Sequence, residues 1–194
     1  MQLSDILALV LSLLSIAVSV TVAYLTLMAR FKGKIWPVTS IVLTKISTPD
    51  KDNIPVIGLA CFLENQGARP GRLDKLRLKV SNTKVESSVS FYPHIMRKDY
   101  SIFASYQDSD WFPFGGVGLF EKGKVQEYYL IFKPRELDYV PYSGEYEIVL
   151  EALWMGSKRW AKVKPVIPLI LTEKNISDWR SPTTPAFQIE VNVR

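Results

Sequence analysis

Apolar residues are concentrated at the N-terminus of the chain, where polar positions almost disappear. The 24 residues from Ile6 to Ala29 include no charged residue, no glycine and no proline. As an α-helix this run is about 36 Å long, against a bilayer hydrocarbon core of about 30 Å. Because lipid cannot satisfy backbone polar groups, such a run has to be helical. The pattern predicts a single transmembrane helix over residues 6–29, preceded by a short tail over residues 1–5.

The flanks of this run distinguish an anchor from a cleaved signal peptide. A signal peptide has a basic start, an apolar stretch of about 7–15 residues and a small-x-small cleavage site. Here Asp5 precedes the run, the run is longer, and Met28-Ala29-Arg30 follows it. The sequence therefore favours an uncleaved anchor.

Basic and aromatic residues follow the apolar run directly, and no Lys or Arg precedes it. Because positive charge is retained on the cytoplasmic side, we expect a protein of the cell membrane with its N-terminus outside and its bulk in the cytoplasm. Residues 30–37 are expected to be a linker at the anionic leaflet, whose lipids attract basic side chains. The predicted membrane-interface anchors are Arg30, Phe31, Lys32, Lys34 and Trp36.

Small residues recur along the run at spacings of three or four, which places them on one face of a helix. Such a face lets another helix approach closely, so it predicts packing against another transmembrane helix, either a second copy or a partner. A chance distribution is the alternative, since Ser and Ala are common in membrane spans. The residues of this predicted packing face are Ala8, Ser12, Ser15, Ser19, Ala23 and Thr26.

Beyond residue 37 the pattern changes to short runs that are typical of strands. Val56–Glu64 is almost entirely apolar and predicts a buried central strand, whereas Leu73–Val80 alternates between apolar and basic residues. Pro165 and Pro168 limit their stretch to an edge strand or extended chain. The predicted strands are residues 38–46, 56–64, 73–80, 84–92, 125–132, 146–154, 160–171 and 187–193, and they predict one antiparallel β-sandwich over residues 38–194.

Two stretches resemble immunoglobulin-like β-sandwiches. The residues CFLENQGARPGRLDKLRLKV, at 61–80, are similar to a strand, an Asn-x-Gly turn and a second strand of such domains. Tyr142-Ser143-Gly144-Glu145-Tyr146 resembles the start of their tyrosine-corner strand, and the resemblance implies a hydrogen bond from Tyr146 to the backbone a few residues upstream. The expected fold is mainly β, with one transmembrane α-helix and an antiparallel immunoglobulin-like β-sandwich. This fold by itself names no function.

Charge adds a second candidate surface. The net charge is +5, and Lys75, Arg77 and Lys79 alternate along one predicted strand, so they share one face. This basic face is either a solvated sheet surface or a contact for the anionic leaflet. We do not expect nucleic acid as a partner, because no recognition motif accompanies the charge.

Residues 91–123 form an unusually long aromatic connection. Three interpretations are open: the rings complete the core, they form a protein-contact surface, or Trp111-Phe112-Pro113-Phe114 enters the membrane interface. The candidate partner surface comprises Tyr106, Trp111, Phe112 and Phe114.

Residues that carry chemistry are few. His94 is the only histidine, and Cys61, the only cysteine, lies in the most apolar strand. The motifs of zinc sites, phosphate-binding loops and nucleophilic hydrolases do not occur. We expect no catalytic residue, no metal and no cofactor. A single cysteine also agrees with a cytoplasmic domain, because sandwiches of this size outside the cell often carry a disulfide.

Together these patterns predict a single-pass membrane protein whose β-sandwich recruits or stabilises an unidentified protein partner at the membrane. Two alternatives are an oligomerising effector that disrupts membranes and an extracytoplasmic module for adhesion or glycan binding. An enzyme is not expected.

Overall fold

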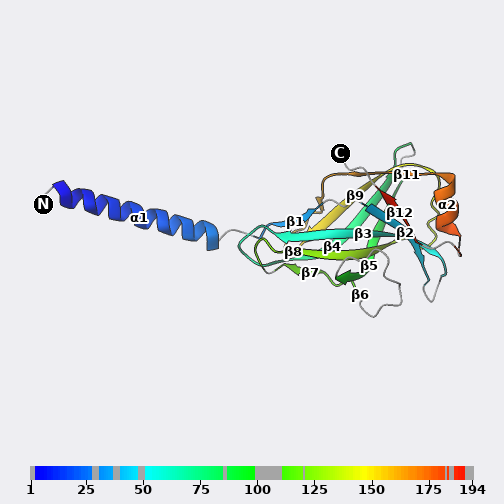
Figure 1. Cartoon of the computed structure of the whole chain (residues 1–194), viewed down its shortest axis with the longest axis horizontal. Coiled ribbons are helices and arrows are strands. Elements are labelled where there is room, and N and C mark those ends of the chain that lie inside the picture. The colour runs from blue at the N-terminus through cyan, green and yellow to red at the C-terminus, as the bar shows by residue number, and fades with distance from the viewer. Residues whose placement is uncertain are drawn as a thin grey trace.

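An apolar helix stands apart from a β domain (Figure 1). The computed structural model describes residues 3–27, 31–36, 40–47, 51–84, 87–98, 111–119, 121–181, 183 and 186–190. Helix α1 (Leu3–Leu27) covers most of the predicted transmembrane run. None of its segment Ser4–Tyr24 is buried against the rest of the protein. Its length and composition suit a membrane span, and a signal sequence at the N-terminus passes the same test.

The described strands form one antiparallel sheet of twelve strands, with the main path β10-β9-β4-β5-β8-β3-β2-β12. Strands β1 and β2 both pair with β3, while β7 pairs with β4, β6 with β5 and β11 with β9. The strands are β1 (Gly33–Trp36), β2 (Ser40–Ile46), β3 (Ile54–Asn65), β4 (Gly71–Asn82), β5 (Ser88–Lys98), β6 (Phe112–Pro113), β7 (Val117–Leu119), β8 (Val125–Pro134), β9 (Gly144–Trp154), β10 (Ala161–Lys162), β11 (Ile167–Leu171) and β12 (Phe187–Glu190).

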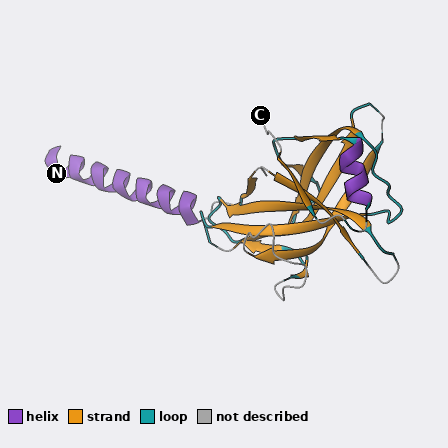
Figure 2. Ribbon diagram, turned by 45° about the vertical axis from the view of Figure 1, so that its right-hand side comes forward, coloured by secondary structure: helices purple, strands orange, loops and turns teal. Residues whose placement is uncertain are grey.

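The sheet curls on itself (Figure 2). It encloses one large cluster of buried apolar side chains. Alternating side chains from strands distant in the sheet order, such as Leu59 of β3 and Leu150 of β9, belong to the same buried cluster. Helix α2 (Glu173–Arg180) adds Ile176 and Trp179, and the Trp179 indole donates a hydrogen bond to the Thr44 carbonyl at 2.8 Å. Burying one such aliphatic side chain contributes about 1.5–3 kcal/mol, so the inward alternation fixes the register.

A second buried cluster lies on the outer face of β2, β3 and β8. Val56 and Ile54 have no exposed surface, and Tyr129 lies across Gly58, where an added Cβ would come within 2.1 Å of the tyrosine hydroxyl. Strand β3 is therefore covered on both faces. This explains its almost continuous apolar sequence and confirms that it is a buried central strand.

The antiparallel, mainly β architecture with an N-terminal apolar helix is confirmed. The Tyr146 hydroxyl donates a hydrogen bond to the Tyr142 carbonyl at 2.9 Å, as the immunoglobulin-like resemblance implies. The strands form one continuous curled sheet, and the immunoglobulin-like arrangement of two sheets stays a prediction.

Several element boundaries differ from the sequence-based ones. Strand β5 extends to Lys98, past the predicted end at residue 92, because a register shift between Pro93 and Ile95 lets pairing continue beyond the proline. Strands β6 and β7 lie within the predicted connection over residues 91–123. Strand β1 lies inside the predicted linker, and α2 was not predicted because it has only eight residues.

Candidate functional site at the α1 end of the sheet

The chain docks onto the β domain almost immediately after the apolar helix. Five residues separate the end of α1 at Leu27 from the start of β1 at Gly33, a reach of about 17 Å at most. The Phe31 ring lies edge-on to Trp154 of β9, with centroids 5.3 Å apart. The Lys32 carbonyl accepts a hydrogen bond from the Gln66 amide at 2.8 Å. The helix is therefore joined to one particular end of the sheet.

Two glycines make room for this aromatic contact. A Cβ added to Gly33 would lie 2.3 Å from the Trp154 ring, and one added to Gly71 would lie 2.1 Å from the Phe31 ring. Both distances are far below van der Waals contact, so larger residues would displace the rings. We call the contact of Phe31 and Trp154 over these glycines the aromatic latch.

Three turns meet at the same end and are joined by hydrogen bonds. Asn65 has no exposed surface; its side-chain oxygen accepts from the Gly67 amide at 2.9 Å and its amide group donates to the Arg69 carbonyl at 2.8 Å. The Asn65 carbonyl accepts from the Gly123 amide at 2.7 Å, which joins the β7–β8 turn. The Met155 amide donates to the Arg72 carbonyl at 2.8 Å, which joins the β9–β10 turn.

These turns, together with residues 31–32, form the surface that we call the basic rim. Lys124 pairs with Glu121 at 2.9 Å, and Arg72 pairs with Asp74 at 3.3 Å. Within the described ranges, the remaining lysines and Arg159 of the rim carry no ion pair. The exposed basic residues of the rim are Lys32, Arg69, Arg72, Lys122, Lys124, Lys158 and Arg159.

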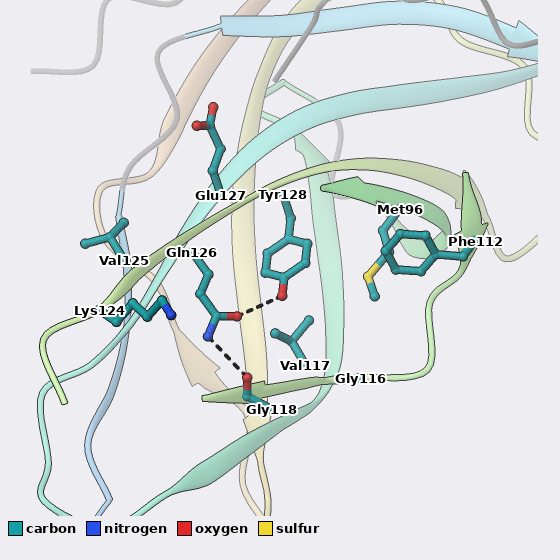
Figure 3. Close-up of a pocket in the computed structure, with 10 residues that line it drawn as sticks. All are labelled: Met96, Phe112, Gly116, Val117, Gly118, Lys124, Val125, Gln126, Glu127 and Tyr128. Carbon is teal, nitrogen blue, oxygen red and sulfur yellow. Dashed lines mark hydrogen bonds between the residues drawn. The ribbon is translucent and has the colours of Figure 1, made fainter. Parts of the chain in front are cut away.

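A cavity of about 620 Å³ lies between β8 and the β6–β7 segment (Figure 3). Tyr128 donates a hydrogen bond to the Gln126 side-chain oxygen at 2.8 Å, and the Gln126 amide group donates to the Gly118 carbonyl at 3.5 Å. Burial raises the pKa of Tyr128, so its hydroxyl stays a neutral donor. Met96 and Phe112 lie at the other side of the cavity. Its walls combine apolar side chains with neutral polar groups and with the charged Lys124 and Glu127, and its size suits the binding of a small group or a side chain.

The predicted basic face lies on the outer face of β4, where Lys75 and Lys79 are exposed. Arg77 between them is engaged: its Nε lies 2.5 Å from an oxygen of the buried Glu151, and its guanidinium lies 4.3 Å from the centroid of the Trp160 ring. The structure thus places all three on one strand face but neutralises the central charge.

The predicted aromatic partner surface is placed only in part, because Tyr106 lies outside the described residues. Trp111 packs edge-on against Tyr129 at 5.9 Å, beside the outer cluster. Phe112 and Phe114 are half-buried against the inner core. These three rings therefore take part in packing on both faces of the sheet, and their role in partner contact stays a prediction.

The predicted membrane-interface anchors differ in what their side chains contact. Phe31 faces the domain as part of the latch, whereas Lys32 is exposed. The Lys34 ammonium lies 3.6 Å from the centroid of the Trp36 ring, and Trp36 is 38% exposed on the outer face of β1. Arg30 lies outside the described residues.

The predicted helix-packing face is uncovered. Ala8, Ser12, Ser15, Ser19 and Ala23 are all exposed on α1, and nothing is described for the Thr26 side chain. Their contact with a second helix therefore stays a prediction.

Cys61 is part of the buried core, and His94 is half-buried on β5. Cys61 has no exposed surface, and burial raises the pKa of its thiol to about 12. Burial, with Lys133 nearby, lowers the pKa of the half-buried His94. Among the described residues no three His, Cys, Asp or Glu side chains form a group that could hold a metal ion.

No protein-family model matches the chain, and no curated protein sequence is significantly similar to it. Several solved structures resemble it distantly, among them the following three. A family 123 glycoside hydrolase from Clostridium perfringens is 11% identical, with a TM-score of 0.38 over 74% of this chain, and the chain spans 28% of that protein. An uncharacterised β-sandwich protein from Clostridium difficile is 15% identical, with a TM-score of 0.32 over 70% of this chain and 86% of the other. The CooA pilin subunit of enterotoxigenic Escherichia coli is 10% identical, with a TM-score of 0.31 over 67% and 88% of the two chains. Likeness at this level identifies no family.

Proposed function

We propose that the protein is a single-pass membrane-anchored interaction protein whose β domain recruits or stabilises a protein partner at the membrane. The observation that carries this proposal is the junction between α1 and the sheet. An apolar helix with no buried segment is followed within five residues by a backbone that is already part of the domain. Such a junction suits a domain that works next to a bilayer.

We propose that the β domain lies in the cytoplasm. Positive charge is retained on the cytoplasmic side of a span, and Lys32 follows α1 closely while the described start of α1 carries only Asp5. The unpaired, buried thiol of Cys61 agrees with a reducing compartment.

The chemistry of the described residues supports binding over catalysis. The cavity beside β8 is lined by apolar and neutral groups together with Lys124 and Glu127, and its hydrogen-bonded pair is Tyr128 and Gln126. The buried thiol of Cys61 is held protonated and is remote from solvent, so it cannot act as a nucleophile. We propose that an apolar side chain of the partner enters this cavity beside Phe112.

Site-specific photo-crosslinking in intact cells tests the proposal. A photoreactive residue at Phe112 is expected to give a discrete crosslinked product that is lost when α1 is deleted. The same residue at Tyr142, which is exposed at the opposite end of the sheet, is the matched control. Identical products from both positions, or a Phe112 product that survives deletion of α1, would contradict recruitment at the membrane.

A further inference from the structure

We propose that the basic rim is a docking surface for anionic lipid headgroups, so that the β domain lies against the leaflet. We call residues 28–32, between α1 and β1, the link. This inference rests on the proposed membrane anchor. It adds a surface built from three turns that are distant in the sequence.

The first support is position. The link from α1 and the β3–β4, β7–β8 and β9–β10 turns are joined to one another by the backbone hydrogen bonds of Lys32, Asn65 and Arg72. The aromatic latch ties the same link to the end of β9. A helix that crosses a bilayer therefore brings these three turns, and not the other end of the sheet, to the lipid surface (Figure 1).

The second support is an asymmetry of charge between the two ends of the domain. Around the rim, seven exposed basic residues face Glu64, Asp74 and Glu121, and two of these carboxylates are paired with rim cations. The opposite end has no such excess of positive charge: Lys51 pairs with Asp138 at 2.6 Å, and Lys84 pairs with Glu145 at 3.6 Å. The residues compared at that end are Lys51, Lys84, Arg135, Lys174 and Arg180 against Asp52, Glu136, Asp138, Glu145, Glu173 and Asp178.

The third support is the shape and chemistry of the β9–β10 turn. Met155 at its tip is 59% exposed, and Lys158 and Arg159 follow it. An apolar tip beside cations is typical of segments that enter the headgroup region. Between this turn and the link lies a hollow of about 550 Å³ lined in part by Lys32, Trp154 and Ser157, which offers a seat for a headgroup.

A lipid surface fits the rim better than a nucleic acid does. The rim cations stand on the tips of separate turns and not along a groove with stacking aromatics, which is how proteins hold single strands. A bilayer is a broad polyanion that the anchor presents to this end alone. Attraction of this kind acts over roughly a Debye length, about 8–10 Å, which is within the reach of the short link.

The experiment uses the full-length chain reconstituted in bilayers of phosphatidylcholine, with or without about 30% phosphatidylserine. A fluorophore is attached to Ser157→Cys in the rim or to the matched Ser177→Cys on α2 at the opposite end. Cys61 remains in place because its buried thiol does not react. Quenching by lipids that carry a headgroup spin label reports contact. We expect quenching at Ser157→Cys to be about threefold stronger with phosphatidylserine and to be lost in about 1 M salt, while Ser177→Cys is unaffected.

Charge removal then assigns the effect to the rim. The triple variant Lys122→Gln/Lys158→Gln/Arg159→Gln should reduce quenching at Ser157→Cys to the level of phosphatidylcholine alone. The matched triple Lys84→Gln/Arg135→Gln/Lys174→Gln at the opposite end should leave it unchanged. Equal quenching in the two bilayers, equal loss in both triples, or displacement of the rim from the bilayer by single-stranded RNA would overturn the proposal.

A separate measurement distinguishes this inference from the anchor on which it rests. Retention of the chain in bilayers after an alkaline carbonate wash supports the anchor whatever the quenching shows. Retention with no dependence on phosphatidylserine overturns the lipid-docking rim alone. Release by the wash contradicts the anchor, and with it the rim.

Discussion

Phe31 and Trp154 pack edge-on with ring centroids 5.3 Å apart, so the first residues after the apolar helix are part of the folded domain. Phe31 borders the helix, whereas Trp154 ends a strand in the last third of the chain. Their contact joins the candidate anchor to the core, since both rings also pack against the inner cluster. This contact fixes the position of Phe31 on the β domain, and it leads to the first prediction.

The aromatic latch predicts that Gly33 does not tolerate a side chain. Gly33→Val forces the Trp154 ring out of place and should cost about 1–3 kcal/mol of unfolding free energy through overpacking. Gly115→Ala is the control, because nothing lies within 4 Å of the added Cβ. Thermal unfolding of the two variants checks this; an equal shift for both would mean that the latch is not packed.

The hydrogen bond from Tyr146 to the Tyr142 carbonyl predicts a modest, specific loss in Tyr146→Phe. Tyr146 is buried, so the unpaired carbonyl should cost about 0.5–1.5 kcal/mol. In the control Tyr142→Phe, the lost contact is a 3.0 Å hydrogen bond between exposed hydroxyls of Tyr142 and Ser87. Denaturant titration should show the larger effect in Tyr146→Phe, and a larger effect in the control would contradict the tyrosine corner.

Arg77 belongs to the basic face, but we predict that its main contribution is to the stability of the fold. Arg77→Ala leaves the carboxylate of Glu151 buried and unpaired, at a cost of about 3 kcal/mol. Lys75→Ala and Lys79→Ala should change stability by less than about 0.5 kcal/mol, because both side chains are exposed. The double variant Arg77→Leu/Glu151→Leu should recover most of the loss. Urea unfolding of Arg77→Leu, Glu151→Leu and the double variant measures the coupling. A loss of stability in the double variant equal to the sum of the two single losses would refute it.

The buried thiol predicts a pH dependence. Burial raises the pKa of Cys61 from 9.0 to about 12, so the folded state holds a proton that the unfolded state releases. This contribution is complete below pH 9 and is lost as the pH rises toward 12, with a limiting slope of about 1.4 kcal/mol per pH unit. Between pH 9 and pH 12, the free energy of unfolding should therefore fall less steeply with pH in Cys61→Ala than in the parent chain. An unchanged slope would show that the thiol is accessible.

The uncovered small-residue face of α1 predicts association between helices. Ser15→Leu/Ser19→Leu should abolish energy transfer between labelled copies in bilayers, because the larger side chains block close approach. Val18→Leu/Val20→Leu, on the remainder of the helix, is the matched control. Transfer that falls equally in both variants, or in neither, would contradict a role for this face.

Hydrophobic periodicity predicted the parts of the fold that depend on burial along a single segment. The alternation of β4 and the continuous apolar pattern of β3 each reflect which strand faces are covered, whereas the apolar run of α1 belongs to a helix whose segment Ser4–Tyr24 is not buried against the domain. Short elements escaped prediction. Strand β6 has only two residues. Helix α2 has a capping box between Thr172 and Asn175, but the helix is short, and the burial of Trp179 that holds it against the sheet is evident only in the folded structure.

The candidate site was predictable only in pieces. The basic residues of the link and of the β3–β4 turn were visible in the sequence, as was the Asn-x-Gly signal at Asn65. Lys122 and Lys158 lie on turns that reach the same end of the domain through strand pairing between distant segments. Local periodicity does not encode this pairing. The need for glycine at positions 33 and 71 could not be predicted from the sequence. It arises because the Trp154 ring lies against Gly33 and the Phe31 ring lies against Gly71.

The central claim is that the β domain is held at the membrane on its cytoplasmic side. We would test it by placing a single reactive thiol at Ser177→Cys, at the end of the domain away from α1, and treating intact cells with a membrane-impermeant maleimide (Figure 1). The buried Cys61 reports unfolding, because it should label only in denaturant. The account predicts that Ser177→Cys is protected in intact cells, labels after lysis, and remains in the membrane fraction. Labelling of intact cells, or release of the chain from the membrane, would contradict it.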